Sequence, residues 1–301
     1  KELEKLILDI KALKIQGNTN IAKSAAKGIL EYITHIKPTS YGEFVAKVKH
    51  YALELANARP NEPLAFNAMT FLINDLDECE TQQQVRIEAI ERIENFFKYI
   101  DESFAIIREN GVEQLKGYQT FMTDCHSSLA RDTLIEIHAH NPKMKVINTE
   151  TRPLYQGRIT AQKLSDAGVH VIHIIDSAVS SIILDPRYLT PEVIIVGSDG
   201  ITVNGDLINK VGTYNLALAA KEAGIPFYVA SQSMKIDPRS ANPESFKIEL
   251  RDPNEVWDEK ELPENVEILN PSFDLVPAEY ITGGYITEKG LLLPEDFKTI
   301  V

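Results

Sequence analysis

The first third of the chain carries apolar residues at helical spacing. Three runs with apolar side chains three or four positions apart cover residues 3–13, 21–33 and 41–55. A longer run starts at Val85 and passes through Ile107 to the pair Asn110–Gly111, where we expect the helix to end. The pattern predicts a helical domain over residues 1–116.

Short apolar runs typical of buried strands follow from about residue 117 onward. They begin near Tyr118, Met144, Val169, Val193 and Pro226. Helical patterns at 159–167 and 207–223 lie between them, and strands alternating with helices indicate a parallel sheet with right-handed crossovers. We expect an α/β protein, with an N-terminal helical domain followed by a Rossmann-like domain with a mostly parallel sheet over residues 117–301. Two later strands are expected at Val266–Leu269 and Tyr285–Thr287.

Composition and charge narrow the function class. The 301 residues are 44% hydrophobic, enough for a substantial core, and 44 acidic against 31 basic residues give a net charge of −13. This charge argues against a nucleic-acid or membrane-surface binder. No apolar run has the length of a membrane span and the first residues are amphipathic rather than signal-like. We expect a cytoplasmic protein with no nucleic-acid or membrane partner.

Residues 194–214 combine several features of an anion site. An apolar strand leads to Asp199, a polar turn follows, and we expect a helix to open around Asn209 and Lys210. Ligands of open α/β sheets lie beyond the carboxyl ends of the strands, and helix N-termini attract anions. The stretch predicts a phosphate site with a carboxylate and a lysine beside it. An ordinary strand-to-helix turn with a capping Asp is an equally good interpretation of this stretch alone.

Cys125 lies between a predicted strand and a helical pattern. A helix N-terminus lowers the pKa of a thiol and stabilises the thiolate, and Ser127 adds a hydroxyl and an amide that can hold an anion. The alternative is a buried cysteine that acts as a small hydrophobe. The other cysteine, Cys79, is distant in sequence, so neither a disulfide framework nor a cysteine zinc site is indicated.

Two further strand ends carry polar residues. Arg152 follows the strand MKVIN, where a guanidinium can clamp a phosphate. Asp176 follows VHVIHII and is either a helix N-cap or an acceptor for a substrate hydroxyl.

In the helical domain, Gly17 and Asn18 precede a helix, in a turn that either binds an anion or is simply capped. Arg59 sits beside a proline and is expected to point toward the second domain.

No zinc, calcium or G-x-S-x-G motif occurs, so neither a metal nor another cofactor is indicated. A thiol, a carboxylate and several anion-binding turns favour acid/base chemistry on a small phosphorylated molecule.

Five segments together resemble one superfamily along nearly the whole chain. They are GSDGITVNGDLINKVGT, TETRPLYQGRITAQKL, DCHSS, ARPNEPLAFNAM and NPSFDLVPAEYITGGYITEKG. The superfamily contains ribose-1,5-bisphosphate isomerases, methylthioribose-1-phosphate isomerases and the alpha, beta and delta regulatory subunits of the eukaryotic exchange factor for translation initiation. Its fold is a helical domain joined to a Rossmann-like domain. The run Cys-His-Ser at 125–127 and the segment IAKSAA look most similar to the archaeal ribose-1,5-bisphosphate isomerases.

The resemblance implies conversion of ribose 1,5-bisphosphate to ribulose 1,5-bisphosphate in nucleotide salvage. The catalytic Cys and Asp of the enzymes fall on Cys125, which we interpret as the base, and on Asp199, which we interpret as the proton shuttle. The resemblance further implies that the phosphates and hydroxyls are held by Gly17, Arg59, Ser127, Arg152, Asn209 and Lys210, with Asp176 near the sugar.

Three departures from the family pattern bear on activity. Gln16 stands where the isomerases usually carry an Arg, Asp124 stands where a His is common, and the segment 231–235 differs from the usual glutamate-containing run. Loss of an Arg and gain of Asp124 near a phosphate weaken anion binding by about 1.5 to 3 kcal/mol. Methylthioribose-1-phosphate isomerisation and a non-catalytic regulatory subunit that binds a sugar phosphate or nucleotide are the alternatives.

The expected partners follow from the same resemblance. The substrate is a small phosphorylated sugar, and the chain is expected to form a homodimer or a homohexamer. Activation by a nucleotide is left open by the sequence.

Overall fold

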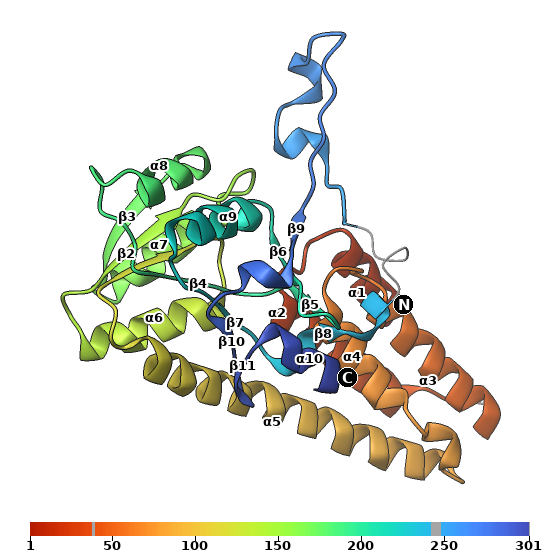
Figure 1. Ribbon diagram of the computed structural model, residues 1–301. Coiled ribbons are helices and arrows are strands. Elements are labelled where there is room, and N and C mark those ends of the chain that lie inside the picture. Colours follow the sequence, from red (N-terminus) through yellow and green to blue (C-terminus); the bar gives the residue numbers. More distant parts are fainter. Residues whose placement is uncertain (38–39, 242–247, 301) are drawn as a thin grey trace. The chain divides into compact units, whose positions relative to one another are not determined.

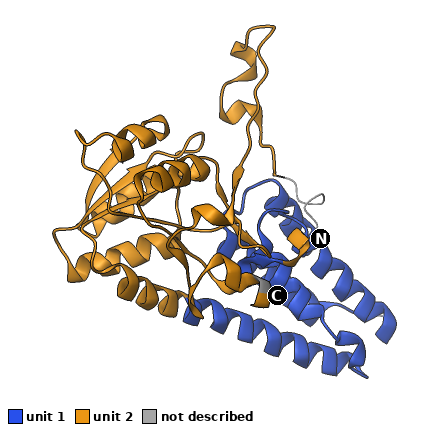
Figure 2. Cartoon of the chain, in the orientation of Figure 1, with its two compact units in different colours: residues 1–103, 234–237 blue, residues 104–233, 238–301 orange. Residues whose placement is uncertain are grey.

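The computed structural model describes residues 1–37, 40–241 and 248–300 of the chain. It divides into two compact units (Figure 2). Unit 1 comprises residues 1–103 and 234–237, and unit 2 comprises residues 104–233 and 238–301.

Unit 1 is built from helices whose apolar stripes face one another. In α2, for example, Ile21, Ile29 and Ile33 are fully buried while the polar positions between them remain more exposed. The three short runs predicted as helices are confirmed. The elements are α1 (Glu2–Lys11), α2 (Asn18–His35), α3 (Tyr41–Ala56), α4 (Pro63–Ile73), η1 (Leu76–Glu78), the first part of α5 (Gln82–Leu115) and the short strand β8 (Ile236–Asp237).

Helix α5 does not end at Asn110–Gly111 as the sequence suggested. It continues to Leu115, because both residues make tertiary contacts that suit a helix. Asn110 Nδ2 donates to the Thr287 carbonyl at 2.9 Å. A Cβ on Gly111 would come within 2.5 Å of Thr133 Cγ2, so only glycine lets α6 approach this closely. Here tertiary packing outweighs the weak helix propensity of the pair.

Unit 2 is a seven-stranded sheet with strand order β11-β10-β7-β4-β1-β2-β3 (Figure 1). All neighbouring strands are parallel except β10 and β11. This confirms the predicted α/β fold with a mostly parallel sheet, including the strand at 285–287. The strands are β1 (Thr120–Thr123), β2 (Lys145–Thr149), β3 (His170–Ile174), β4 (Val193–Val196), β7 (Phe227–Ala230), β10 (Gly284–Thr287) and β11 (Gly290–Leu292).

Helices cover both faces of this sheet. On one face, Phe121, Val193 and Ile195 pack in a single core with residues of α6, α7 and the end of α5. The alternate strand residues Met122 and Ile194 are also fully buried, as expected for a parallel sheet covered on both sides. The helices are α6 (Ser128–His140), α7 (Gln156–Asp166), α8 (Val179–Leu184), α9 (Thr213–Ala223) and α10 (Phe297–Ile300), with short turns η2 (Asp176–Ala178), η3 (Ser233–Lys235), η4 (Pro238–Ala241), η6 (Pro253–Glu255), η7 (Glu259–Glu261), η8 (Ala278–Tyr280) and η9 (Pro294–Asp296).

The segment predicted as a strand-to-helix turn at 194–214 is instead a strand, a hairpin and a helix. Strands β5 (Gly200–Thr202) and β6 (Leu207–Lys210) pair antiparallel around a turn in which Gly205 has φ 84°. Strand β6 also pairs antiparallel with β9 (Phe273–Val276). Asn209 and Lys210 therefore end a strand, and helix α9 begins only at Thr213. The helical interpretation of 207–212 is wrong because strands on both sides of β6 fix it as extended.

The stretch at 250–271 extends away from the sheet (Figure 1). The strand expected at Val266–Leu269 does not form there. Val266 is 43% exposed and Leu269 is 76% exposed, and the nearest ladder contact is an isolated bridge between Leu250 and Pro271. The N–H of Val266 donates instead to the nearby Pro263 carbonyl at 3.1 Å, and no strand of the described residues lies beside this run to pair with it.

Candidate active site

The strand order changes direction at β1. From β1 the chain proceeds to β2 and β3 on one side, and then returns to place β4, β7 and β10 on the other. The carboxyl ends of β1 and β4 therefore flank a topological switch point, the usual ligand site of an open α/β sheet. Cys125 follows β1 and Asp199 follows β4, with Phe121 in register with Val193.

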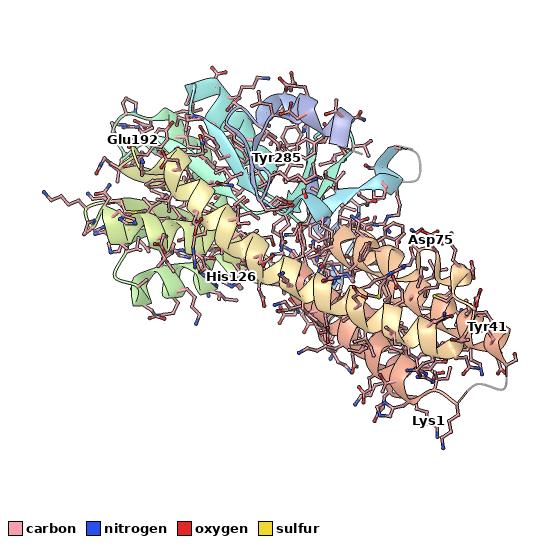
Figure 3. All side chains as sticks on the ribbon, turned by 90° about the horizontal axis from the view of Figure 1, so that it is seen from below. Lys1, Tyr41, Asp75, His126, Glu192 and Tyr285 are labelled. Atoms are coloured by element: carbon pink, nitrogen blue, oxygen red, sulfur yellow. The ribbon has the colours of Figure 1, made fainter. Side chains whose placement is uncertain are left out.

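The backbone of Cys125 is held in an uncommon conformation, with φ 53°. Its N–H donates to Thr151 Oγ1 at 2.9 Å, and its carbonyl accepts from Thr160 Oγ1 at 2.7 Å. The ring of His126 lies at the start of α6 (Figure 3), with Nδ1 2.9 Å from the same Thr160 oxygen. A non-glycine residue in this region is strained by roughly 1–3 kcal/mol, and these contacts hold the Cys125 backbone in that conformation.

The thiol of Cys125 is half-buried, and its electrostatic surroundings oppose ionisation. Burial raises its pKa well above the ordinary value, and the carboxylates of Asp124 and Asp199 raise it further, while Lys210 lowers it. The expectation of a stabilised thiolate is therefore wrong for the free protein. The main cause is the burial of the thiol, and the two neighbouring acids add to it.

Asp124 is buried directly before Cys125, with 6% of its surface exposed. Its Oδ2 lies 2.6 Å from Thr213 Oγ1 on α9. Burial raises the pKa of this carboxyl to about 7, with smaller contributions in the same direction from Asp274, Asp199 and Asp176. Thr213 offsets part of this rise. Asp124 is thus half protonated near neutral pH.

Asn209 and Lys210 are both buried at the end of β6, 4% and 6% exposed. Asn209 Nδ2 donates to Thr213 Oγ1 at 3.0 Å. Within the described part of the chain Lys210 forms no ion pair with a carboxylate, although its charge acts on the Cys125 thiol. A buried ammonium without an ion-paired carboxylate among the described residues is suited to an anionic ligand.

The N-terminus of α9 is occupied by a carboxylate of the chain itself. Asp274 Oδ2 accepts the N–H groups of Gly212 at 2.8 Å and Tyr214 at 2.9 Å. The anion-binding helix start predicted from the sequence therefore has a ligand supplied by β9. Of this segment, Lys210 is left as the predicted anion-binding group.

Ser127 is the N-cap of α6, and its Oγ accepts from the N–H of Ala130 at 3.3 Å. Gly197, directly after β4, lies against it. A Cβ on Gly197 would come within 2.3 Å of Ser127 Cβ and of Ser127 Oγ. The absent side chain lets the ends of β1 and β4 approach each other.

Arg152 and Asp176 meet at the ends of β2 and β3. Asp176 accepts the backbone N–H of Thr151 at 2.8 Å and of Arg152 at 2.7 Å. It caps neither η2 nor α8, so the N-cap interpretation is wrong. The side chain of Arg152 is exposed and donates to Tyr155 Oη at 2.8 Å and to the Val256 carbonyl at 3.2 Å.

Three of the predicted substrate residues belong to unit 1. Gly17 is the N-cap of α2 with φ 86°, and Asn18 is the buried first residue of that helix. Arg59 is buried, with Nη2 3.0 Å from Glu62 Oε1. Their roles toward a substrate stay predictions.

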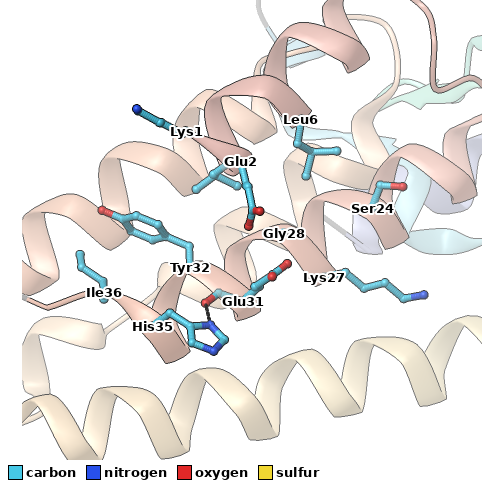
Figure 4. A pocket seen from close by; sticks show the side chains of 11 residues that line it. Lys1, Glu2, Leu6, Ser24, Lys27, Gly28, Glu31, Tyr32, His35 and Ile36 are labelled. Carbon is cyan, nitrogen blue, oxygen red and sulfur yellow. Dashed lines mark hydrogen bonds between the residues drawn. The ribbon is translucent and has the colours of Figure 1, made fainter.

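A groove of about 860 Å³ also lies in unit 1, between α1 and α2 (Figure 4). Its lining includes Lys1, Lys27, Glu31 and Tyr32. None of the residues predicted to bind substrate lines it.

In residues 1–37, 40–241 and 248–300, no three His, Cys, Asp or Glu side chains are grouped so as to hold a metal ion. In the same residues, no helix has the length and apolar character to cross a membrane.

Several residues of the site escaped sequence reasoning. Thr151, Thr160 and Thr213 fix Cys125 and the end of β6, and Asp274 caps α9. Thr151, Thr160 and Asp274 each act on a segment many residues away. Thr213 contacts the distant Asp124 and also its near neighbours Asn209 and Lys210, which the sequence had assigned to the wrong element. Asp124 was noted as a departure from a family pattern, and its burial gave no signal in the sequence.

The fold and the switch-point residues define a class of α/β proteins. Its members have a helical N-terminal unit and a mostly parallel sheet, with a thiol and a carboxylate at the carboxyl ends of two central strands. Residues 14–294 match the model of the Initiation factor 2 subunit family. The chain belongs to this family.

Three relatives illustrate its range. A ribose 1,5-bisphosphate isomerase of Archaeoglobus fulgidus is 35% identical over 288 residues, covering 95% of this chain and 88% of the relative. The crystal structure of a translation initiation factor eIF-2B of Pyrococcus horikoshii has a TM-score of 0.81 at 25% identity, covering 98% of each chain. The 5-methylthioribose 1-phosphate isomerase of the same organism has a TM-score of 0.76 at 27% identity, covering 99% of this chain and 85% of that one.

Proposed function

We propose that this chain is an aldose–ketose isomerase that converts ribose 1,5-bisphosphate to ribulose 1,5-bisphosphate. The observation that carries the proposal is the pairing of Cys125 with Asp199 at the β1/β4 switch point, in a chain 35% identical to a relative named ribose 1,5-bisphosphate isomerase. Aldose–ketose isomerisation is acid/base chemistry, which a thiol and a carboxylate can perform. The product would enter nucleotide salvage.

The reaction needs four proton movements. The C1–O4 bond breaks while O4 gains a proton, C2 then loses its proton, the hydroxyl on C2 loses its proton, and C1 gains one. The two protons lost from C2 and from its hydroxyl balance the two gained at O4 and C1. The substrate and the product are therefore isomers.

The raised pKa of Cys125 supports giving the thiol two of these steps in the proposed reaction. A thiol that is protonated in the free enzyme gives its proton to O4 as the ring opens, and the resulting thiolate removes the proton from C2. Asp199 takes the proton of the hydroxyl on C2 and returns it to C1. Both groups finish in the protonation state in which they began, and Cys125 is the base at C2.

Anion binding completes the proposal. The buried ammonium of Lys210 would pair with a phosphate or an ionised hydroxyl, and the charge of that ion pair would be shielded from water. Arg152, Ser127 and Asn209 are proposed as further ligands in unit 2. Gly17, Asn18 and Arg59 are proposed as ligands from unit 1.

The test is incubation of the purified protein with ribose 1,5-bisphosphate in D2O, with the product followed by NMR. We expect ribulose 1,5-bisphosphate that carries solvent deuterium at C1, and loss of turnover in Cys125→Ser and Asp199→Asn. Cys79→Ser is the matched control, because Cys79 lies in unit 1 and is not part of the proposed site. Absence of product from the wild type, or undiminished turnover in both active-site variants, would contradict the proposal.

Methylthioribose-1-phosphate isomerisation is the second candidate, favoured by the fold shared with the Pyrococcus horikoshii enzyme. Its substrate has an apolar thioether where the bisphosphate has a second charge. A panel of both substrates distinguishes the two reactions by their kcat/KM. Binding of either sugar phosphate without turnover would instead favour a regulatory subunit, and light scattering would measure the proposed homodimer or homohexamer.

A further inference from the structure

The hydroxyl of Thr213 is fully buried among three polar neighbours. Its Oγ1 lies 2.7 Å from the Lys210 carbonyl, 3.0 Å from Asn209 Nδ2 and 2.6 Å from Asp124 Oδ2. One hydroxyl thus joins the end of β1, the end of β6 and the start of α9. Its single proton can go to only one of two acceptors, the Lys210 carbonyl or Asp124 Oδ2.

A threonine hydroxyl has one proton to donate and two lone pairs to accept with. The carbonyl of Lys210 can only accept, so its hydrogen bond needs the Thr213 proton. Asn209 Nδ2 can only donate, so it occupies one lone pair. The remaining lone pair faces Asp124 Oδ2, and a hydrogen bond of 2.6 Å forms there when Asp124 carries the proton.

The second oxygen of Asp124 leads to the same conclusion. Within the described chain, Asp124 Oδ1 is buried without a hydrogen-bond partner. A buried carboxylate oxygen without a partner is far more costly than the carbonyl oxygen of a neutral acid.

The charges around Asp124 also favour the neutral acid. Asp274 on β9, Asp199 after β4 and Asp176 at η2 each oppose its ionisation. The neighbouring Cys125 is protonated in the free protein, while Lys210 supplies the positive charge of this region. The pKa of about 7 arises chiefly from burial, and the hydrogen bond with Thr213 counts against this rise.

We propose that Asp124 is a positioning residue that acts as a neutral carboxylic acid: it donates its proton to Thr213 and so holds the end of β6, with Asn209 and Lys210, in place for the substrate. The inference rests on the proposed function for its effect on catalysis. The hydrogen-bond arrangement itself does not depend on the substrate.

Ionisation of Asp124 would rearrange this network. The carboxylate has no proton to donate, so Thr213 turns its own proton toward Asp124 and leaves the Lys210 carbonyl unpaired. The negative charge also lies beside the thiol and competes with the substrate for Lys210. Substrate binding should therefore weaken as Asp124 ionises.

Infrared spectroscopy tests the protonation state without any substrate. We expect the carbonyl band of a protonated carboxyl group at pH 5.5 that disappears with a midpoint near pH 7 and is absent from Asp124→Asn. If Asp124→Asn does not fold, Thr213→Val assigns the band by shifting it to higher frequency, while Thr213→Ser leaves it in place. A wild-type spectrum without this band at pH 5.5 overturns the proposal.

Hydrogen exchange tests the positioning, again without substrate. Exchange of the 207–213 segment, corrected for the intrinsic rate, should be equal in wild type and Asp124→Asn at pH 6 and faster in the wild type at pH 8.5. Equal exchange at both values overturns the positioning role.

The effect on catalysis is measured as KM for ribose 1,5-bisphosphate against pH. In the wild type, KM should rise by about ten-fold for each pH unit well above 7, because only the protonated fraction binds well. In Asp124→Asn, KM should lack this rise over the same range. Titration of the substrate's own phosphates affects both proteins alike and cancels in the comparison. A parallel rise in both proteins overturns the proposal, whereas absence of turnover in the wild type at every pH refutes the isomerase and leaves the infrared and exchange results to decide the role of Asp124.

Discussion

Replacing Asp124 by Asn should make the unfolding free energy of the protein fall less as the pH rises. The pKa of the acid goes from 3.8 in the unfolded chain to about 7 in the folded protein. Its proton is therefore bound more tightly in the folded state, and the stability that this proton contributes is complete below pH 3.8 and is lost as the pH rises through 7. Asparagine does not titrate and keeps an N–H donor for Thr213.

The size of the effect follows from the same two pKa values. Between pH 5 and pH 8 the wild type should lose about 2.5 kcal/mol of unfolding free energy relative to Asp124→Asn. All other groups titrate alike in the two proteins and cancel in the difference.

Urea unfolding at both pH values, followed by circular dichroism, measures this difference. Asp185→Asn is the control, because hydrogen bonds from the exposed Arg187 lower the pKa of Asp185, and its effect should not change between pH 5 and pH 8. A stability difference between wild type and Asp124→Asn that is the same at both pH values would refute the buried neutral acid.

Three further substitutions test the framework of the site by thermal or urea unfolding. Gly197→Ala should destabilise unit 2 by about 1–3 kcal/mol, because its Cβ would overlap Ser127, whereas Gly117→Ala, with open space around its Cβ, should have little effect. Thr160→Val leaves the Cys125 carbonyl without its donor and should cost about 1–3 kcal/mol, while Thr160→Ser should restore most of it. Asp274→Ala removes the cap of α9 and should cost about 0.5–2 kcal/mol; unchanged stability in any of the three would contradict the contact assigned to it.

The sequence was informative about local elements and strand ends. The periodicity of residues 3–55 and the apolar runs after residue 117 identified most helices and strands, because burial on one face or on both leaves a regular pattern. The rule that ligands lie at the carboxyl ends of parallel strands directed attention to Cys125 and Asp199, which follow adjacent strands.

Errors arose where distant contacts decide the local structure. Gly111 stays helical because α6 packs against it, and Asn209 and Lys210 are extended because β9, from a distant part of the chain, pairs with β6. The pKa of Cys125 depends first on burial and then on Asp124 and Asp199, and sequence spacing alone evaluates none of these effects.

The most direct test of the central claim is the reaction of ribose 1,5-bisphosphate with the wild type and Cys125→Ser in D2O. The account predicts ribulose 1,5-bisphosphate with deuterium at C1 from the wild type and from Cys79→Ser, and no product from Cys125→Ser. Equal product formation by wild type and Cys125→Ser, or none by the wild type, would contradict it.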